Sequence, residues 1–489
     1  MKKKVAIIGG GITGLSTAYF LKEKSKEQGI DIDCTLIESG NRWGGKIITD
    51  RVSDFIIEGG PDSFLSQKPW GIALCRKLGL LDQVVQTDPV HKAVYIVSGG
   101  TLKKCPDGMN LMIPGRITPF LLTSLISWSG KARMGLDLLI PRRSPQNEGE
   151  DESIAAFVRR RLGSEAVATF AEPILATIYA GDVEQLSLAA TFPQLAGLER
   201  EFGSLIFGVW MKKWDAQLSR KRKSREGKNK THFPPPAVPL TLFVTLKNGL
   251  ESLVTALEKQ LEGVVHMRRG QAVLEILPQE KGYVIVLPND KLPVDAVVVT
   301  TDTHTAARFI TPWNNQLASH LAAIPYVSTA TVSLGFQKKD VTHPLNGFGF
   351  VIPRTERKSI LAATWSSTKF KGRADESDVL IRTFVGGAHQ EEIVDLPEDQ
   401  LISTICDELT PLLGITATPI VHRVFRWKKG NPQYNVGHLD RIAQIEKETE
   451  KHPGLFLAGA AYKGVGIPDC IEQGWNRSDQ VLRFLAGLS

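Results

Sequence analysis

The sequence predicts an α/β fold in which a discontinuous, Rossmann-like domain encloses an inserted mixed α/β domain and a helical domain. Three observations support this prediction. An apolar, β-rich run near the amino terminus breaks into glycines and resumes with helical spacing. A second β-rich run follows and ends in an acidic residue. Near the carboxyl terminus, a strand, a glycine-rich turn and a helix follow one another again, so one domain uses both ends of the chain.

The amino-terminal pattern predicts a phosphate site. Residues 3–10, KKVAIIGG, form a short apolar strand, and apolar residues from Ile12 to Leu21 recur at helical intervals. Glycines in GxGxxG spacing lie between the two. The first permits a tight turn, the second lets the backbone approach a pyrophosphate, and the third lets helix and strand pack closely. We predict that phosphate meets the backbone N–H groups of the helix start at Gly9, Gly10, Gly11, Ile12, Thr13 and Gly14.

The second β-rich run, IDCTLIESG, strengthens this interpretation. It ends in Glu38, which lies 24 residues beyond Gly14, where a carboxylate can accept hydrogen bonds from the ribose hydroxyls of an adenine dinucleotide. A glycine-rich turn that binds no ligand would by itself account for the GxGxxG spacing. It does not explain the acid that follows, so the sequence favours a bound dinucleotide.

Two further turns and the closing segment resemble a flavoprotein superfamily. ESGNRWGGKIITD (38–50) follows the second strand, FIIEGGPDSF (55–64) comes next, and PGLFLAGAAYKGVGIPDCIEQGWNRSDQV (453–481) closes the chain. These stretches resemble the amine oxidases, phytoene desaturases and protoporphyrinogen oxidases, in which such segments line FAD. The resemblance implies non-covalent FAD and, besides the GxGxxG residues, a site comprising Glu38, Ser39, Arg42, Gly44, Gly45, Lys46, Gly60, Pro61, Asp62, Ser63, Val273, Trp427, Gly459, Ala460, Val465, Gly466 and Ile467. For Val273 and Trp427, an ordinary core position is an equally good interpretation.

Three stretches resemble the protoporphyrinogen and coproporphyrinogen III oxidases more specifically. They are EGGPDSF (58–64), GFGFVIPRTERKSILAATWSSTKFKGRA (347–374) and NPQYNVGH (431–438). The whole chain resembles this family, most closely its soluble Gram-positive type. The resemblance implies oxidation of coproporphyrinogen III to coproporphyrin III, and also of protoporphyrinogen IX to protoporphyrin IX, in haem biosynthesis. The flavin carries the chemistry in three hydride transfers, six electrons in all, with O2 as acceptor and H2O2 as product, and no catalytic side chain is assigned.

The implied substrate is a bulky apolar macrocycle with propionates, which needs an apolar slot with cations at its rim. By resemblance, Lys92 pairs with a propionate, and Val351 and Phe370 enclose a pyrrole ring. A surface lysine, a strand valine and a core phenylalanine are equally good interpretations. Plant and animal relatives tend to carry arginine where this chain has Lys92, a point charge without the bidentate fork, so the propionate geometry is open.

Composition limits the other partners. The 489 residues are 42% hydrophobic and 23% charged, with a net charge of +7, which favours an acidic partner such as a phosphorylated cofactor, a carboxylated substrate or an anionic membrane face. No run approaches the roughly 20 apolar residues that span a bilayer, so we expect peripheral membrane contact at most. The five cysteines form no CxxC pair, which indicates no metal site and favours a reducing cytoplasm.

The scattered cofactor segments predict the domain boundaries. We expect FAD-binding parts at 1–70, 248–309 and 426–489, substrate-domain parts at 71–109 and 310–425, a helical domain at 110–205, and a substrate-domain or linker segment at 206–247. By resemblance, the helical domain can rest on a membrane surface. The basic run SRKRKSREGKNK (219–230) is predicted to be a solvated loop, and no nucleic-acid partner is expected because aromatic residues do not interleave with its charges. The family also includes homodimers, and a hand-off of product to the next haem-pathway enzyme is a further expectation.

Two rival functions stay open. A flavin amine oxidase of the same fold would need two aromatic rings that cage the amine, and some amine oxidases attach FAD through a cysteine. Cys470 lies in the closing segment, but PDCIEQG resembles the porphyrinogen oxidase form, in which the flavin is not covalently held. A non-enzymatic flavin-binding scaffold is the rival from another class.

Overall fold

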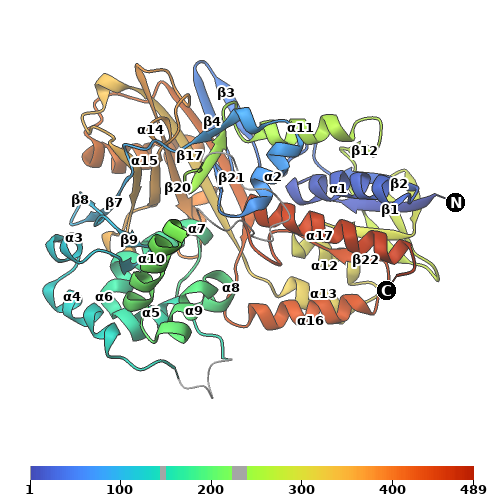
Figure 1. Cartoon of the computed structure of the whole chain (residues 1–489). Helices are drawn as coiled ribbons and strands as arrows, with labels where there is room; N and C mark the ends of the chain where they lie inside the picture. Colours follow the sequence, from blue (N-terminus) through green and yellow to red (C-terminus); the bar gives the residue numbers. More distant parts are fainter. Residues whose placement is uncertain (1, 144–149, 223–238, 489) are drawn as a thin grey trace. The chain divides into compact units, whose positions relative to one another are not determined.

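The computed structural model describes residues 2–143, 150–222 and 239–488 (Figure 1). The chain divides into two compact units. Unit 1 comprises Met1–Thr87, Pro235–Pro325 and Asp440–Ser489, and unit 2 comprises Asp88–Pro234 and Tyr326–Leu439. Unit 1 contains both ends of the chain, which confirms the predicted discontinuous α/β architecture.

Unit 1 is built on a five-stranded parallel sheet with the strand order β12-β2-β1-β16-β22. In β1 and β16 the residues at the sheet centre are apolar and fully buried, as expected for a parallel sheet whose two faces are covered by helices. The strands are β1 (Lys3–Ile8), β2 (Ile32–Glu38), β12 (His266–Arg269), β16 (Ala296–Val299) and β22 (Leu455–Leu457).

The two ends of the chain meet through two helices of unit 1, α1 (Ile12–Gln28) and α17 (Ile467–Leu485), which lie side by side in Figure 1. A Cβ on Gly474 would lie 2.9 Å from the backbone nitrogen of Thr17, so the helices approach closely there. The buried Lys24 ammonium donates to the carbonyl of Trp475 at 2.8 Å and pairs with Asp479 at 2.8 Å. These contacts join segments more than 400 residues apart.

The remaining elements of unit 1 form smaller sheets, ordered β5-β11-β6, β13-β14-β15 and β3-β4, and further helices. Helix α2 packs on α17 and β6 pairs with β11, so residues 71–86 belong to unit 1, whereas the predicted substrate-domain segment begins at residue 71. The elements are β3 (Thr49–Val52), β4 (Phe55–Glu58), β5 (Phe64–Leu65), β6 (Val84–Gln86), β11 (Phe243–Leu246), β13 (Glu275–Pro278), β14 (Tyr283–Leu287), β15 (Asp290–Val294), α2 (Pro69–Lys77), α11 (Glu251–Leu261), α12 (Thr303–Ile310), α13 (Asn315–Ala322) and α16 (His438–Glu450).

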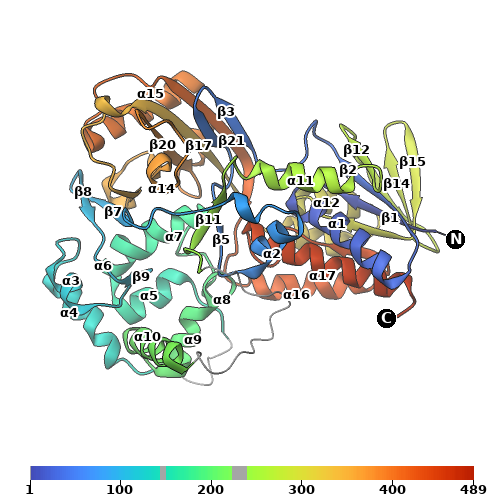
Figure 2. The same ribbon diagram turned by 45° about the horizontal axis from the view of Figure 1, so that its top comes forward.

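Unit 2 contains a seven-stranded sheet with the order β21-β17-β20-β19-β18-β7-β8. Neighbouring strands are antiparallel except β18 and β7, which are parallel. Helix α15 (Glu398–Leu413) buries Leu401, Ile405 and Leu409 in the same core as the sheet residues Val332 and Ile381, and Figure 2 shows it beside the sheet. The strands are β7 (Ala93–Ser98), β8 (Thr101–Lys104), β17 (Tyr326–Gln337), β18 (Gly347–Val351), β19 (Ile360–Trp365), β20 (Asp378–Gly386) and β21 (Val421–Pro432).

Residues 110–143 and 150–222 of unit 2 are mainly helical, around a second core of buried Leu, Ile, Val and Phe side chains. The basic run predicted as a loop begins inside α10, because residues 219–222 continue that helix; lysine and arginine are good helix formers. Residues 223–230 lie outside the described residues. The helices of this part are α3 (Ile117–Leu122), α4 (Trp128–Gly135), α5 (Ile154–Leu162), α6 (Ser164–Ala166), α7 (Glu172–Tyr179), α8 (Leu188–Thr191), α9 (Pro193–Phe202) and α10 (Leu205–Arg222), with a π-helix at Val167–Ala171 and a 3-10 turn at Leu136–Leu138. The short helix α14 (Ser366–Lys369) follows β19. In the described part of the chain, no helix combines the length and apolar character needed to cross a membrane.

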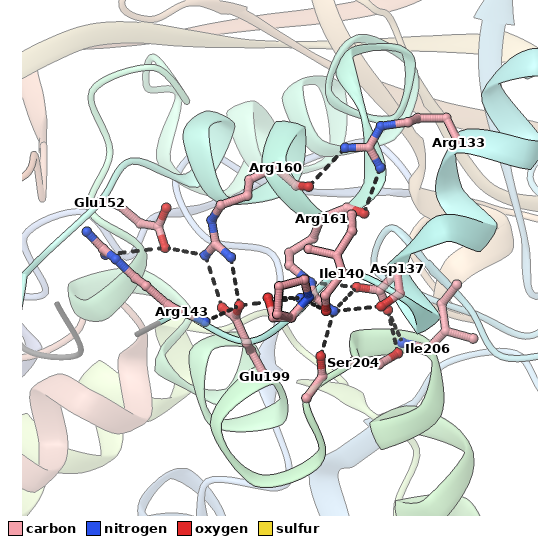
Figure 3. Close-up of polar contacts among 12 residues, drawn as sticks. Arg133, Asp137, Ile140, Arg143, Glu152, Arg160, Arg161, Glu199, Ser204 and Ile206 are labelled. Atoms are coloured by element: carbon pink, nitrogen blue, oxygen red, sulfur yellow. Dashed lines mark hydrogen bonds and ion pairs between the residues drawn. The ribbon is translucent and has the colours of Figure 1, made fainter. Parts of the chain in front are cut away.

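A buried charge network holds the helices of unit 2 together (Figure 3). Arg161 and Asp137 are both 0% exposed, and the Arg161 Nε donates to an Asp137 carboxylate oxygen at 2.6 Å. The other carboxylate oxygen accepts from the Ser204 hydroxyl at 2.6 Å and from the backbone N–H of Ile206 at 2.9 Å. The Arg161 guanidinium also donates to the carbonyl of Gly203 at 2.7 Å. Asp137 thus ties the turn after α4 to the start of α10.

Glu199 extends this network and makes its stability depend on pH. Arg160 donates to both Glu199 carboxylate oxygens, at 2.6 and 3.0 Å. Burial by itself would raise the pKa of Glu199, but the hydrogen bonds and charges of Arg160 and Arg161 outweigh it and lower the pKa. A carboxylate with a lowered folded-state pKa stabilises the protein above its unfolded pKa of about 4.3, and this contribution is lost as the pH falls through the folded value.

We therefore expect Glu199→Gln to be less stable than the wild-type protein at pH 7, and this difference in stability to become small in acid. The difference in free energy of unfolding between variant and wild type should shrink below about pH 4, because the wild-type carboxylate is then being protonated. Urea unfolding of both proteins at pH 7 and at lower pH measures it. Glu201→Gln serves as the control, since the Glu201 side chain is 58% exposed and pairs with the exposed Lys212 at 3.4 Å. A difference that does not change with pH would contradict the assignment.

Candidate functional site

The candidate site lies at the carboxyl ends of the parallel strands of unit 1. Gly9 follows β1, Glu38 ends β2, Thr300 follows β16, and Gly459 comes two residues after β22. Because the strands are parallel, these positions share one edge of the sheet, where ligands of open α/β sheets bind. The Thr300 hydroxyl lies 2.9 Å from the carbonyl oxygens of both Ile8 and Gly9, so it fixes the first turn.

The glycines of this turn are needed for two different reasons. Gly9 has a φ of 108°, a backbone conformation that favours glycine. A Cβ on Gly14 would lie 1.9 Å from the Gly9 carbonyl oxygen, and one on Gly10 would lie 2.4 Å from the Trp43 ring. A Cβ on Gly11, however, would meet no protein atom within 4 Å, and the φ of −70° suits any residue. Packing within the protein thus accounts for three glycines and leaves Gly11 beside open space.

The start of α1 has the features of an anion site. Its N-cap residue, Gly11, provides no side-chain hydrogen bond to the first turn. The N–H groups of a first helical turn have no partner within the helix, and the helix dipole places partial positive charge there. With Gly11 leaving room beside them, these groups fit a pyrophosphate.

Glu38 lies beside this turn and is held by backbone. One carboxylate oxygen accepts from the N–H of Gly10 at 2.6 Å and the other from the N–H of Gly40 at 2.7 Å. The Ser39 hydroxyl is 3.3 Å from the same carboxylate. Backbone bonds from residues 270 and 271 to residues 40 and 38 bring the following loop, including the buried Val273, to the end of β2. Glu38, Ser39 and Val273 therefore lie at one corner of the candidate site, and their contact with a cofactor stays a prediction.

The 42–47 loop is anchored to the glycine turn by a backbone bond from Gly44 to the Gly10 carbonyl at 2.8 Å. Arg42 stabilises this loop from within, because its guanidinium donates to the carbonyl oxygens of Gly45 and Ile47, the latter at 3.0 Å. Gly44 has a φ of 101°, which again favours glycine. Arg42 therefore fixes the backbone of this loop.

The 58–63 turn packs against the same loop. A Cβ on Gly60 would lie 1.8 Å from the Lys46 carbonyl oxygen, and the Ser63 hydroxyl donates to Asp62 at 2.6 Å. Pro61 lies between them. Glu58, the acid that opens this turn, points elsewhere: it is buried and accepts from the Leu250 N–H and the Thr49 hydroxyl, both at 2.8 Å. Its carboxylate holds the start of α11.

The closing segment reaches the glycine turn through the first turns of α17. Cys470 is buried and hydrogen-bonds the side chain of Thr13 in α1, and burial raises the pKa of its thiol to about 11. Charges on Lys46 and Lys68 also act on this thiol. The structure thus brings residues 9–14, 46 and 466–470 into one site.

Two polar side chains that the sequence analysis missed hold this segment. Lys68 donates to both carboxylate oxygens of Asp469, at 2.6 and 2.7 Å, and the same carboxylate accepts from the Gly466 N–H at 3.2 Å. The buried Gln473 accepts from the Gly459 N–H at 3.1 Å and donates to the Lys463 carbonyl at 3.3 Å, so it shapes the loop that contains Ala460. Val465 and Ile467 flank the N-cap of α17. No local pattern marks a lysine 401 residues from its partner.

Four predicted site residues belong to unit 2. Lys92 is exposed just before β7, and Trp427 is half-buried in β21 opposite Thr329. Val351 ends β18 and is 8% exposed within the helical core, and Phe370, directly after α14, is 1% exposed. Their contributions to a cofactor or substrate site stay predictions. Across the described ranges, no group of three or more His, Cys, Asp or Glu side chains could hold a metal ion.

Comparison with known proteins agrees with this geometry. The model of the flavin-containing amine oxidoreductase family matches residues 12–482. The coproporphyrinogen III oxidase of Bacillus subtilis (strain 168) is 37% identical over 486 residues, which cover 99% of each chain. The chloroplastic protoporphyrinogen oxidase 1 of Arabidopsis thaliana is 28% identical over 494 residues, covering 98% of this chain and 88% of that protein. A crystal structure from Exiguobacterium sp. 255-15 is similar with a TM-score of 0.85 and 31% identity over 99% of both chains.

These similarities extend over almost the entire length and confirm the resemblance found in the sequence. The glycine turn, the acid after β2 and the helix start at the closing segment are the parts of unit 1 that a flavin dinucleotide requires. The chain belongs to the flavin-containing amine oxidoreductase family, in the branch that includes the coproporphyrinogen III and protoporphyrinogen oxidases.

Proposed function

We propose that this protein is an FAD-dependent oxidase that converts coproporphyrinogen III to coproporphyrin III in haem biosynthesis, and that it also accepts protoporphyrinogen IX. The observation that carries the proposal is the 37% identity to a coproporphyrinogen III oxidase over 99% of both chains. Identity to a protoporphyrinogen oxidase is lower, at 28%. O2 is the proposed electron acceptor, so each cycle removes a hydride and a proton from the macrocycle and forms one H2O2.

The proposed FAD site uses the residues of unit 1 in distinct ways. The N–H groups at the start of α1 bind the pyrophosphate, Glu38 accepts the ribose hydroxyls, and the loop around Gly44 closes the same side. The start of α17 and the 459–466 loop, shaped by Gln473, bind the flavin end. When bound, the flavin supplies the redox chemistry by accepting a hydride from a substrate C–H bond, and the protein orients the reactants and excludes water.

The substrate residues proposed from the family pattern are Lys92, Val351 and Phe370. Lys92 is exposed and has no ion pair within the part of the chain that the structure describes, so its ammonium is available to a propionate. Val351 and Phe370 are almost fully buried, which supports a role in giving an apolar wall its shape. Trp427 is proposed to lie near the flavin. KM for coproporphyrinogen III in Lys92→Gln tests the first role.

Turnover of a porphyrinogen tests the proposed function. We expect the holoenzyme under air to convert coproporphyrinogen III to fluorescent coproporphyrin III with one H2O2 for each pair of electrons removed. Protoporphyrinogen IX should react with a lower kcat/KM. The controls are enzyme-free air oxidation and an anaerobic sample, which should stop after the bound flavin is reduced. Oxidation of a primary amine but of neither porphyrinogen would favour the amine oxidase, and no turnover at all would favour the scaffold.

We propose that FAD is held without a covalent bond. Cys470, the cysteine of the closing segment, is buried, and with a pKa of about 11 its thiol stays protonated near neutral pH, which makes it a poor nucleophile. Acid precipitation should therefore release all yellow colour into the supernatant. The Cys470→Ser variant should give the same result. Flavin that stays with the wild-type precipitate and leaves the variant would show a cysteinyl link.

Location and assembly stay predictions. Each of the five cysteines is a free thiol, which favours the reducing cytoplasm. Peripheral contact with an anionic membrane is supported by exposed apolar side chains on consecutive short elements of unit 2, and vesicle co-sedimentation measures it. They are Ile117, Leu121, Leu122, Trp128, Leu136, Leu138 and Leu139. A homodimer and transfer of product to the next haem-pathway enzyme are further expectations from the family, and sedimentation velocity tests the first.

A further inference from the structure

A small cavity in unit 2 has a charged lining that the flavin site does not use. Its walls come from three segments, around the start and end of α7, the turn after β18, and the turn after β20. The lining includes Glu172, Arg354, Lys358 and His389. Its volume is about 20 Å³, which is room for one or two water-sized groups. A single carboxylate group is of that size.

The acceptors around this cavity already have partners. The Glu172 carboxylate accepts from the backbone N–H of Arg354 at 3.1 Å. Asp182, behind His389, accepts from the N–H of Glu184 at 2.9 Å and from the Gln185 side chain at 3.3 Å. An Asp182 oxygen also lies 3.6 Å from the His389 ring nitrogen. The charges of Glu172 and Arg354 also act on one another. Neither carboxylate forms an ion pair with Lys358 in the described part of the chain.

The N–H donors of Arg354 and Lys358 outnumber the acceptors that they contact among the described residues. Arg354 uses one guanidinium nitrogen, Nη1, to contact the His389 ring, at 2.8 Å to Nε2, and a guanidinium carries five N–H groups. Lys358 is half-buried, and its ammonium has no ion pair or hydrogen bond with any described residue. Arg354 is exposed and Lys358 is half-buried, and both line the cavity. Three N–H donors of Lys358 and several of Arg354 have no acceptor among the described residues. An anion with at least two acceptor oxygens suits these donors.

The backbone around the cavity is fixed in uncommon conformations. Ala180 has a φ of 50°, which is unfavourable for a residue with a Cβ, and its carbonyl accepts from the N–H of Ala388 at 2.9 Å. Gly387 donates to the Ser328 carbonyl at 2.8 Å. A π-helix at Val167–Ala171 directly precedes Glu172, and such turns are frequent at functional sites. The walls are therefore held in place before any ligand binds.

We propose that this cavity binds a carboxylate group through Arg354 and Lys358, with His389 and Glu172 positioning Arg354. A planar carboxylate matches the arginine fork and fits the volume. It can come from a propionate of the macrocycle or from a small free carboxylate. The first source rests on the proposed function, whereas the carboxylate chemistry follows from the cavity alone. A macrocycle with four propionates would gain more from such a site than one with two.

Binding measurements on the holoenzyme test the proposal. Coproporphyrin III is titrated while quenching of tryptophan fluorescence is followed, and sodium propionate is titrated while the unfolding temperature is followed. The variants are Lys358→Gln and Arg354→Gln, and Arg357→Gln is the matched control, since Arg357 does not line the cavity. We expect each cavity variant to weaken coproporphyrin III binding about tenfold, as loss of a charge-assisted hydrogen bond does. The control should bind coproporphyrin III like wild type. Coproporphyrin III tetramethyl ester, which has no free carboxylate, should bind with the same affinity to the wild type and to the variants.

The outcomes distinguish a propionate of the macrocycle from a small free carboxylate as the ligand. They also distinguish failure of the carboxylate site from failure of the proposed porphyrinogen oxidase function. Loss of sodium propionate stabilisation in the variants, with unchanged coproporphyrin III affinity, supports a site for a free carboxylate and overturns the macrocycle source. Unchanged affinity for both ligands in both variants overturns the carboxylate site. Weakened coproporphyrin III binding in an enzyme that oxidises no porphyrinogen supports the site and rejects the proposed function.

Discussion

Replacing Gly11 with alanine is expected to remove bound flavin while leaving the protein folded. A Cβ at this position meets no protein atom within 4 Å, and the backbone conformation suits alanine. The added methyl group would instead occupy the space that a pyrophosphate needs beside the start of α1. An overpacked contact costs about 1–3 kcal/mol, which corresponds to up to roughly a hundredfold higher Kd for the cofactor. Flavin content after purification and titration of the apoprotein with FAD measure the effect.

Gly14→Ala is expected to destabilise the folded protein itself, unlike Gly11→Ala. Its Cβ would lie 1.9 Å from the Gly9 carbonyl oxygen and 2.8 Å from the Thr300 hydroxyl, so the protein itself must distort. We expect a loss of about 3 kcal/mol or more in the free energy of unfolding. Thermal unfolding should therefore separate the two variants.

The matched control for both is Gly197→Ala in α9, where a Cβ also meets no atom within 4 Å. Alanine in a helix should raise stability slightly and leave flavin binding unchanged. If Gly11→Ala retains flavin as wild type does, the amino-terminal turn does not hold the pyrophosphate, and the proposed FAD site is wrong.

Asp137→Ala is expected to have the largest effect on stability in unit 2. It leaves the Arg161 guanidinium, which is 0% exposed, with only the more distant Glu199 carboxylate, at 3.5 Å, among the described residues. It also removes acceptors from the Ser204 hydroxyl and the Ile206 N–H. Breaking a buried ion pair by removing one partner costs about 3–5 kcal/mol, because the other charge stays buried and unpaired. Urea unfolding followed by far-ultraviolet circular dichroism measures the change.

The comparison variants show which part of the side chain matters. Asp137→Asn keeps the shape and one carbonyl oxygen but removes the charge, so it should recover only part of the loss. Glu201→Gln breaks an exposed pair with Lys212, whose side chain is 53% exposed, and should change stability by less than about 1 kcal/mol. An Asp137→Ala protein as stable as Glu201→Gln would show that the remaining acceptors of Arg161, Glu199 and backbone carbonyls such as that of Gly203, suffice without Asp137.

The turns and helix starts of the candidate site could be predicted because they are encoded locally. Gly9 and Gly14 meet needs of the turn that other residues do not meet as well, and Gly11 leaves space beside the helix start. Glu38 ends a strand whose apolar run is visible in the sequence. The segment around Gly466 follows the same rule of strand, turn and helix start. The structure places all of these at one edge of the parallel sheet.

The role of individual polar side chains was harder to predict, because it depends on partners far away in the sequence. Glu58 looked like part of a flavin-lining turn, yet its carboxylate bonds Thr49 and the start of α11. The Arg42 guanidinium donates hydrogen bonds to carbonyl oxygens of its own loop. The pairing of Lys68 with Asp469 has no local signature at all.

By itself, the sequence determined the dinucleotide turn, the discontinuous α/β architecture and the family, since glycine spacing and hydrophobic periodicity act over a few residues. Only the tertiary structure decided which charges are paired, such as Asp137 with Arg161, and which are left with unused donors, such as Lys358. The physical reason is range: backbone conformation is set by near neighbours, whereas burial and hydrogen-bond partners are set by the packing of segments that are remote along the chain.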